Sequence, residues 1–438
     1  MNLQSLTSRR GRKAAVLARA AAPGISVALS GCSGGGGSSS GGGGDGKATV
    51  TYGVWDITQA VVMKQLAAEF HKQNPNITVQ VQVTPWDSYW TKLKTAATGG
   101  SAPDVFWMND ANFAQYASGG AIKDLQPMVD KSDIKMSNYV PAQAKAYTYN
   151  GHVYGIPKDV DSIALWYNKK LFKEAGVNPP TANWTGDDLI AAAQKLTNKA
   201  KGVYGIAAQN TGQQSYYVTI PQEGGYVISP DKTKSGLDSP ESIKGIQFWT
   251  DLINKYHVSP TLQAQTDTAA DNMFESGKIA MIYEGSWAAA EFAGVPYTKA
   301  NADVAPLPKL AQAGGVSNGL ANVMSAKTQH PDQAWKWLAF LGSKHAADVQ
   351  AQTGIVIPAY NGTAEEWTQS PISKFYNLQP FADDLKVATA YPSSQNTAAW
   401  SDAIATELNK AYTGDETAAQ AAKNAAAIMN KALAAEQH

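Results

Sequence analysis

From residue 48 onward, short apolar segments alternate with amphipathic helical patterns, and this alternation limits the possible folds more than any other feature. Apolar and polar residues alternate across 48–54 and 77–83, which predicts two strands. A helical pattern over 59–73 separates them, and a second over 86–99 precedes a buried strand ending near Asn109. Such repeats predict a parallel sheet covered by helices on both faces. At 438 residues the chain exceeds one hydrophobic core, so we expect an α/β protein of two lobes.

The segment 154–176 predicts a passage from one lobe to the other. Gly155 and Pro157 interrupt the preceding pattern, a β-prone run follows over 163–167, and a short helix ends at Gly176. Because the strand–helix pattern resumes afterwards, we expect a parallel-rich sheet flanked by helices in each lobe. The expected division assigns residues 47–158 and 306–342 to the first lobe, and residues 159–305 and 343–438 to the second.

Further elements are expected after this passage. A capping box beginning at Thr185 predicts a helix over 189–197, and a short strand is expected over 204–207. A strand near 279–283 should end in a turn at Gly285 that presents Trp287. The second lobe should therefore also carry polar and aromatic groups at strand ends.

Residues 1–31 resemble an export signal, with a basic start and an apolar run over 20–29. The run ends in Leu29-Ser-Gly-Cys32, which resembles a lipobox and predicts that Cys32 carries a lipid anchor. Residues 33–46 are Gly and Ser except for Asp45, so 32–46 should form a flexible tether. A twin-arginine route is indicated only by Ser8-Arg-Arg, without the hydrophobic half of that motif. An incidental thiol in a disordered leader is the alternative for Cys32.

The charge distribution excludes several classes of ligand. All four arginines precede Cys32, and the rest of the chain has 31 lysines against 36 carboxylates, a net charge of −5. No basic patch is present to bind nucleic acid. Arginine is also the preferred group for holding carboxylate or phosphate, so anionic ligands are disfavoured. The 12 tryptophans and 19 tyrosines suit weakly polar rings, although most of them should fill the core.

Polar and aromatic residues follow the expected strands. Trp55 and Asp56 end the first strand, and Asn109 and Asp110 end the third. In open α/β sheets, ligands bind beyond the carboxyl ends of the strands. These four residues are therefore candidates for ligand contact. Two further carboxylates, Asp159 and Asp161, open the passage between the lobes; the alternative is that they are solvated hinge charges.

The chain contains, in one order, Gly100–Phe106, Tyr154–Pro157 with Tyr167-Asn168 and Leu171-Phe172, Met273–Met281 leading to Trp287, and Pro331 with Ala334–Leu338. Together these motifs resemble the extracellular solute-binding proteins, family 1 type, of carbohydrate ABC importers. The resemblance covers about residues 48–360. It implies a periplasmic-binding-protein-like fold, three hinge crossings, a sugar held between closing lobes, a transmembrane permease as partner, a monomer, and lipid anchoring outside the cell membrane.

The resemblance also implies roles for single residues. It gives Asp110 as an acidic sugar ligand, Trp287 as a residue that stacks on a sugar ring, and Asn318 and Gly319 as parts of a glycine-rich loop facing the cleft. Trp55, Asp56, Asp159 and Asp161 are assigned mainly from their positions at strand ends. Trp86 and Tyr360 complete the set of expected contacts.

Enzymatic alternatives have specific motifs to satisfy. Gly315-Val-Ser-Asn-Gly319 matches the nucleophile elbow, but the expected loop before and strand after it do not fit that motif. A secreted glycoside hydrolase could use a pair among Asp56, Asp110, Asp159 and Asp161, and a non-sugar solute is the other alternative. We expect no enzyme and no cofactor. No metal is expected either, because the six histidines are scattered and Cys32 is the only cysteine.

Overall fold

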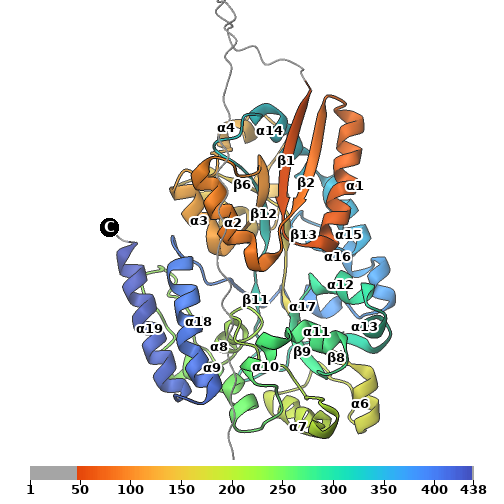
Figure 1. Ribbon diagram of the computed structural model, residues 1–438, viewed down its shortest axis with the longest axis vertical. Helices are drawn as coiled ribbons and strands as arrows, with labels where there is room; N and C mark the ends of the chain where they lie inside the picture. Colours follow the sequence, from red (N-terminus) through yellow and green to blue (C-terminus); the bar gives the residue numbers. More distant parts are fainter. Residues whose placement is uncertain (1–46, 437–438) are drawn as a thin grey trace, which may run out of the picture. The chain divides into compact units, whose positions relative to one another are not determined.

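The computed structural model describes residues 47–436 (Figure 1). The predicted signal peptide, the predicted lipid anchor at Cys32 and the whole predicted tether therefore lie outside the described residues. Within the described part, two sheets each organise a lobe, and we name the lobes after them. The first lobe surrounds the five-stranded sheet and the second surrounds the three-stranded sheet. Among residues 47–436, no helix is both long and apolar enough to span a bilayer.

The five-stranded sheet confirms the expected strand–helix repeat. Its order is β2 (Ile77–Val83), β1 (Ala48–Val54), β3 (Val105–Asn109), β12 (Leu320–Met324) and β6 (Gly155–Pro157). β1 runs parallel to β2 and to β3, whereas β12 runs antiparallel to β3 and to β6. β12 lies between β3 and β6 and belongs to chain that returns from the second lobe.

Helices cover both faces of this sheet, because successive side chains of each strand point to opposite faces. Trp107 of β3 packs in a cluster with α1, α14 and α15, while its neighbours Phe106 and Met108 pack in a second cluster with α2 and α3. The helices are α1 (Ile57–Gln73), α2 (Trp86–Gly99), α3 (Asp110–Ser118), α14 (Pro331–Leu341) and α15 (Lys344–Thr353). Smaller elements here are α4 (Gln126–Val129), η1 (Met136–Asn138), α5 (Pro141–Ala146), β4 (Thr148–Tyr149) and β5 (His152–Val153).

The second sheet has the order β10 (Ala302–Ala305), β8 (Ile163–Asn168) and β9 (Met281–Gly285). Both pairs are antiparallel, so the expectation of a parallel-rich sheet in this lobe is wrong. The expected strand over 204–207 is also absent as a strand. Tyr204 makes a single parallel bridge to Ile279, and Ala207 donates a backbone hydrogen bond to Met281. This segment thus runs beside β9 without completing a ladder.

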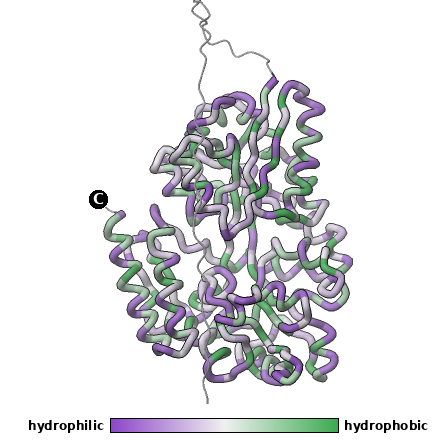
Figure 2. Tube along the Cα trace, in the orientation of Figure 1, coloured by the Kyte–Doolittle hydropathy of each residue, from purple (hydrophilic) through white to green (hydrophobic). Residues whose placement is uncertain are grey.

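Helices enclose the second sheet. α18 (Ala398–Thr413) and α19 (Ala418–Ala435) lie side by side and pack on α9 (Pro240–Asn254), and apolar and polar residues alternate along them in Figure 2. The expected helix near 189–197 is α7, which has the predicted capping box. The remaining elements are α6 (Lys169–Ala175), α7 (Gly186–Leu196), η2 (Lys199–Lys201), α8 (Tyr216–Gln222), α10 (Leu262–Asp267), α11 (Ala270–Glu275), α12 (Ala288–Gly294), α13 (Pro296–Asn301), α16 (Ala364–Thr368), η3 (Pro371–Lys374) and α17 (Gln379–Asp384).

The chain crosses between the lobes along three segments. The first runs from β6 through β7 (Asp159–Val160) into β8, and the second runs from β11 (Val316–Ser317) into β12. The third follows α15 through β13 (Ile357–Pro358), which pairs antiparallel with β7. β11 itself pairs with β14 (Thr389–Ala390) in the second lobe. Leu307 and Val316 pack in the core of the second lobe, although residues 306–342 were expected in the first.

The burial of β12 within the first sheet can be tested by shortening one of its side chains. Val323 is fully buried in β12, whereas Val61 on α1 is 67% exposed. Val323→Ala should lower the free energy of unfolding by about 1.5–3 kcal/mol, because it removes buried apolar surface. The same substitution at Val61 should change it by less than about 0.5 kcal/mol. Urea unfolding of both variants measures the difference, and equal effects would contradict the burial of β12.

Candidate functional site

The candidate residues of the first lobe lie where β1 and β3 end and the following helices begin. Asp56 caps α1, since its Oδ1 accepts hydrogen bonds from the backbone amides of Thr58 and Gln59 at 2.7 and 3.0 Å. Asn109 caps α3 in the same way by accepting from the amide of Asn112. Asp110 is the first residue of α3. The strand-end prediction therefore places these side chains at helix starts, where part of their hydrogen-bonding capacity is used.

Trp55 is the centre of an aromatic cluster on this edge of the sheet. Its ring centroid lies 5.3 Å from that of Trp86, 4.9 Å from Tyr89, 5.7 Å from Trp90 and 5.1 Å from Trp107. Trp107 is fully buried, whereas Trp86 is 50% exposed. The cluster thus extends from the core to solvent and presents an indole next to Asp56. Such a surface suits the apolar face of a ring with polar edges.

Asp110 meets the second lobe. Ser393 lies in the segment between β14 and α18, and its Oγ is 3.5 Å from Asp110 Oδ1. Burial raises the pKa of Asp110 to about 6, and the charge of Lys232 partly opposes this rise. The charges of Asp110 and Asp161 both raise the pKa of Tyr391, so both carboxylates lie near that phenol.

Asp161 joins two of the crossing segments to a loop of the second lobe. Its Oδ1 accepts a hydrogen bond from Gln213 Nε2 at 2.7 Å and one from the Asn318 amide at 3.2 Å. The backbones of Asp161 and Asn318 also bond to each other. Burial raises the pKa of Asp161 to about 8, with a further contribution from the charge of Asp159 and a smaller opposing one from Lys158. The side-chain amide of Gln213 and the carboxyl group of Asp161 therefore meet where two of the crossing segments lie side by side.

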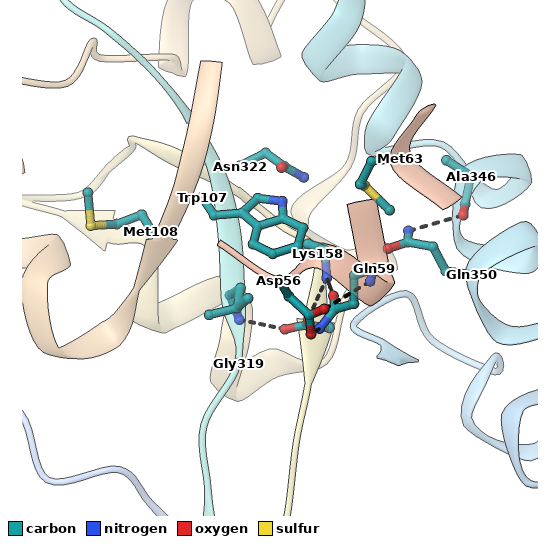
Figure 3. A network of polar contacts seen from close by, with 12 residues as sticks. Asp56, Gln59, Met63, Trp107, Met108, Lys158, Gly319, Asn322, Ala346 and Gln350 are labelled. Atoms are coloured by element: carbon teal, nitrogen blue, oxygen red, sulfur yellow. Dashed lines mark hydrogen bonds and ion pairs between the residues drawn. The ribbon is translucent and has the colours of Figure 1, made fainter. Parts of the chain in front are cut away.

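Asp159 is held in a buried ion pair rather than free for a ligand. Its Oδ2 lies 2.6 Å from Lys158 Nζ, and its Oδ1 accepts from the Leu320 amide at 2.7 Å. Lys158 Nζ also donates to Gln59 Oε1 at 2.8 Å, and Gln59 Nε2 donates to Asp56 Oδ2 at 2.8 Å. Figure 3 shows this network beneath the ring of Trp107. A continuous set of polar contacts thus links Asp56 to Asp159.

Trp287 lies at the second-lobe side of the junction between the lobes. Its ring covers Gly285, where an added Cβ would lie 2.1 Å from the indole, so only glycine fits there. The Ser286 amide donates to Ser162, next to Asp161. Trp287 is therefore held beside the first crossing segment, as a partly buried residue packed against the core of the second lobe.

Acidic side chains lie around this turn, and Glu284 is the buried one among them. Burial and the nearby Asp271 raise the pKa of Glu284, which accepts hydrogen bonds from the Gly285 amide and from Gln214 Nε2. Burial also raises the pKa of Glu291 to about 7, with contributions from Asp271, Glu275 and Asp56. Because Asp56 belongs to the first lobe and Glu291 to the second, acidic groups of both lobes face each other. Among residues 47–436, no group of three or more His, Cys, Asp or Glu is arranged to hold a metal ion.

Gly319 and Tyr360 differ in their relation to this junction. A Cβ on Gly319 would lie 2.3 Å from the carbonyl oxygen of Asp159, so a close backbone approach requires glycine there. Tyr360 instead stacks edge-on against Tyr139 at 5.6 Å and lines a separate cavity of 430 Å³ with Asn138 and Lys344. The structure therefore groups Gly319 with the junction residues and does not group Tyr360 with them.

Sequence reasoning missed several polar residues that the structure brings to the junction. Lys158 stands next to Asp159 in the sequence, and that adjacency was the one signal that could have identified it. The others lie on helices, in distant loops or on a strand read only as core. These are Gln59, Gln213, Gln214, Glu284, Glu291, Tyr391 and Ser393.

Residues 55–348 match the family model of the bacterial extracellular solute-binding proteins. The chain belongs to this family. A related solute-binding protein, the maltodextrin-binding protein MdxE of Bacillus subtilis, is 26% identical, and the match covers 86% of this chain and 89% of that protein.

Two solved solute-binding proteins resemble this one over nearly their whole length. An ABC substrate-binding protein of Listeria monocytogenes, in complex with cycloalternan, is 28% identical with a TM-score of 0.82, covering 88% of this chain and 99% of that one. A solute-binding protein of Thermotoga lettingae, bound with α-D-tagatose, is 25% identical with a TM-score of 0.77 and the same coverage. The expected fold class and family are thus confirmed.

The titration of Asp161 predicts how the stability of this solute-binding protein depends on pH. The folded pKa of about 8 exceeds the ordinary value of 3.8, so the folded state binds the proton more tightly than the unfolded state. Raising the pH from about 4 to 8 should therefore lower the free energy of unfolding. Asp161→Asn removes this titration and should flatten the decline.

Urea unfolding at several pH values between these limits measures the slope for each protein. Asp267→Asn, at an exposed position, is the control and should keep the wild-type slope. An Asp161→Asn variant with the wild-type slope would show that other groups carry the pH dependence.

Proposed function

We propose that this protein is the sugar-binding subunit of an ABC import system and captures a neutral mono- or oligosaccharide between its lobes. The observation that carries the proposal is the exposed indole of Trp86, which lies in the Trp55 cluster beside Asp56. The absence of arginine after Arg19 supports a neutral ligand. The cycloalternan, tagatose and maltodextrin bound by, or named for, the related proteins support the same class.

The proposed mechanism uses groups from both lobes. Trp55, Trp86 and Trp287 stack on the apolar faces of sugar rings, and carboxylates accept hydrogen bonds from the hydroxyl groups. Asp110 serves from the first lobe and Asp161 from the crossing. Because the ligand touches both sides only when the lobes are closed, it shifts the hinge equilibrium towards the closed form. The closed form then docks on the permease.

We also propose that Cys32 anchors the protein to the outer face of the cell membrane. The lipobox-like sequence before it and the Gly/Ser composition of 33–46 support this. By random-coil scaling, the tether spans roughly 20 Å. An importer subunit held at this distance stays close to its permease while its two lobes remain free to move.

Binding without cleavage is the proposed outcome for the sugar. A glycoside hydrolase needs two carboxyl groups free to act on the glycosidic bond. Of the four candidate carboxylates, Asp56 already caps α1 and Asp159 already pairs with Lys158. Asp110 and Asp161 remain, and the charge of each raises the pKa of Tyr391. Because two of the four carboxylates are already engaged in structural contacts, a binding protein is favoured over a hydrolase.

Thermal unfolding of residues 47–438 with a panel of sugars tests the proposal. The panel contains glucose, tagatose, maltose, maltotriose, cellobiose and cycloalternan. A ligand at 100 times its Kd should stabilise the protein by about 2.7 kcal/mol. We expect a clear shift with at least one sugar, which chromatography then recovers intact. Cleaved sugar would support a hydrolase, and the absence of a shift with every sugar would contradict the proposed substrate.

Trp86→Ala tests the aromatic surface. Half of the Trp86 side chain is exposed, so its loss should have little effect on folding. Losing one ring contact should weaken sugar binding by about 1 kcal/mol, roughly fivefold in Kd. Trp335→Ala on α14 is the control and should leave Kd unchanged. Isothermal titration calorimetry gives both values, and an unchanged Kd for Trp86→Ala would remove this residue from the site.

A further inference from the structure

Lys158 is the one lysine that is buried among residues 47–436, and its side chain is 1% exposed. A buried ammonium group is costly unless it is paired and hydrogen-bonded. Nζ meets this requirement with Asp159 Oδ2 at 2.6 Å and Gln59 Oε1 at 2.8 Å. It also lies 4.5 Å from the centroid of the Trp107 ring, a cation–π contact. The charge is thus held by three separate parts of the fold.

The first of these parts is formed by the three crossing segments, to which Asp159 belongs. The Lys158 amide donates to Leu320 at 2.7 Å, and the Lys158 carbonyl accepts from the Ala359 amide at 3.1 Å. Asp159 accepts from the Leu320 amide and pairs with Pro358 between β7 and β13. All three connections between the lobes therefore touch residues 158–159.

The other two parts lead to the candidate sugar contacts. Gln59 receives the bond from Lys158 and donates to Asp56 at the start of α1. The Trp107 ring faces the ammonium and packs edge-on against Trp55, with ring centroids 5.1 Å apart. Figure 3 shows Lys158 between Gln59 and Trp107, with Asp56 beside them. The same charge therefore contacts the residues behind two of the candidate sugar contacts of the first lobe, Trp55 and Asp56.

We propose that Lys158 is a positioning residue that couples the sugar contacts of the first lobe to the three crossing segments. A sugar that fixes Trp55 and Asp56 also fixes Trp107 and Gln59, and these hold the ammonium and its partner Asp159 in place. The closed arrangement of the crossings is then favoured when the sugar is bound. This role in sugar binding rests on the proposed function.

A charge-neutral pair of substitutions separates coupling from simple stability. Lys158→Met alone leaves Asp159 buried without its partner and should destabilise the protein strongly. Adding Asp159→Asn removes the unpaired charge, and the asparagine oxygen can still accept from the Leu320 amide. The double variant should therefore regain most of the lost thermal stability. The exposed pair Lys170–Glu174, also 2.6 Å apart, supplies the control Lys170→Met with Glu174→Gln.

The first readout is affinity for the panel sugar that shifts the wild type most, measured by calorimetry. The double variant lacks the charged hydrogen bond and the cation–π contact, so Kd should rise about tenfold even where thermal stability is recovered. The control should bind like the wild type. Recovery of both stability and Kd in the double variant would overturn the proposal, because the pair would then have only a structural role.

The second readout needs no ligand. Hydrogen exchange in sugar-free protein should become faster in the double variant both at the crossings, over 318–322 and 357–360, and at the start of α1, over 56–63. Faster exchange at the crossings alone, with wild-type exchange over 56–63, would overturn the coupling. If no panel sugar binds the wild type but exchange rises in both places, the proposed substrate fails and the coupling stands.

Discussion

The ion pair between Lys158 and Asp159 constrains the arrangement of this protein more than any other contact. Removing either charge from water costs several kcal/mol, and only close pairing and further hydrogen bonds offset that cost. The 2.6 Å contact must therefore be kept whenever the protein is folded. Since Leu320 and Ala359 bond to the same two residues, the three connections between the lobes are held together on the first-lobe side.

Carboxyl groups near this pair have shifted pKa values. Carboxyl groups come to the junction from both lobes, with pKa values raised to about 6 at Asp110, about 8 at Asp161 and about 7 at Glu291. Each shift arises mainly from burial, which favours the protonated form. Near neutral pH such groups can donate as well as accept hydrogen bonds, which matches sugar hydroxyl and ring oxygens. An anionic ligand would meet repulsion there, in agreement with the absence of arginine.

The first sheet could be predicted from sequence because its signals are local. The alternation over 77–83 gives the full extent of β2, and the two glycines after residue 98 give the end of α2. The antiparallel second sheet could not be predicted, because alternation shows which face of a strand is buried and not which strand lies beside it. The irregular segment 204–207 has the apolar composition of a strand but only one bridge to Ile279.

From local pattern alone, residues of the site were predictable where they follow a strand. Asp56, Asn109 and Asp110 satisfy that rule, and the structure places them together at one edge of the first sheet. Gln59 is 99 residues from Lys158, so no local pattern could connect them. Ser393 reaches Asp110 across 283 positions for the same reason. Tyr360 was assigned without a strand-end position, and it lines a different cavity.

The late position of β12 in the sequence determines when the first sheet can be completed during synthesis. β3 is complete at residue 109, but its partner begins only at residue 320. Until then, one edge of β3 is open and can pair with other chains. Long-range pairing of this kind is also slow to form. The first sheet can therefore be completed only after most of the chain has been synthesised, because one edge of β3 waits for residues 320–324.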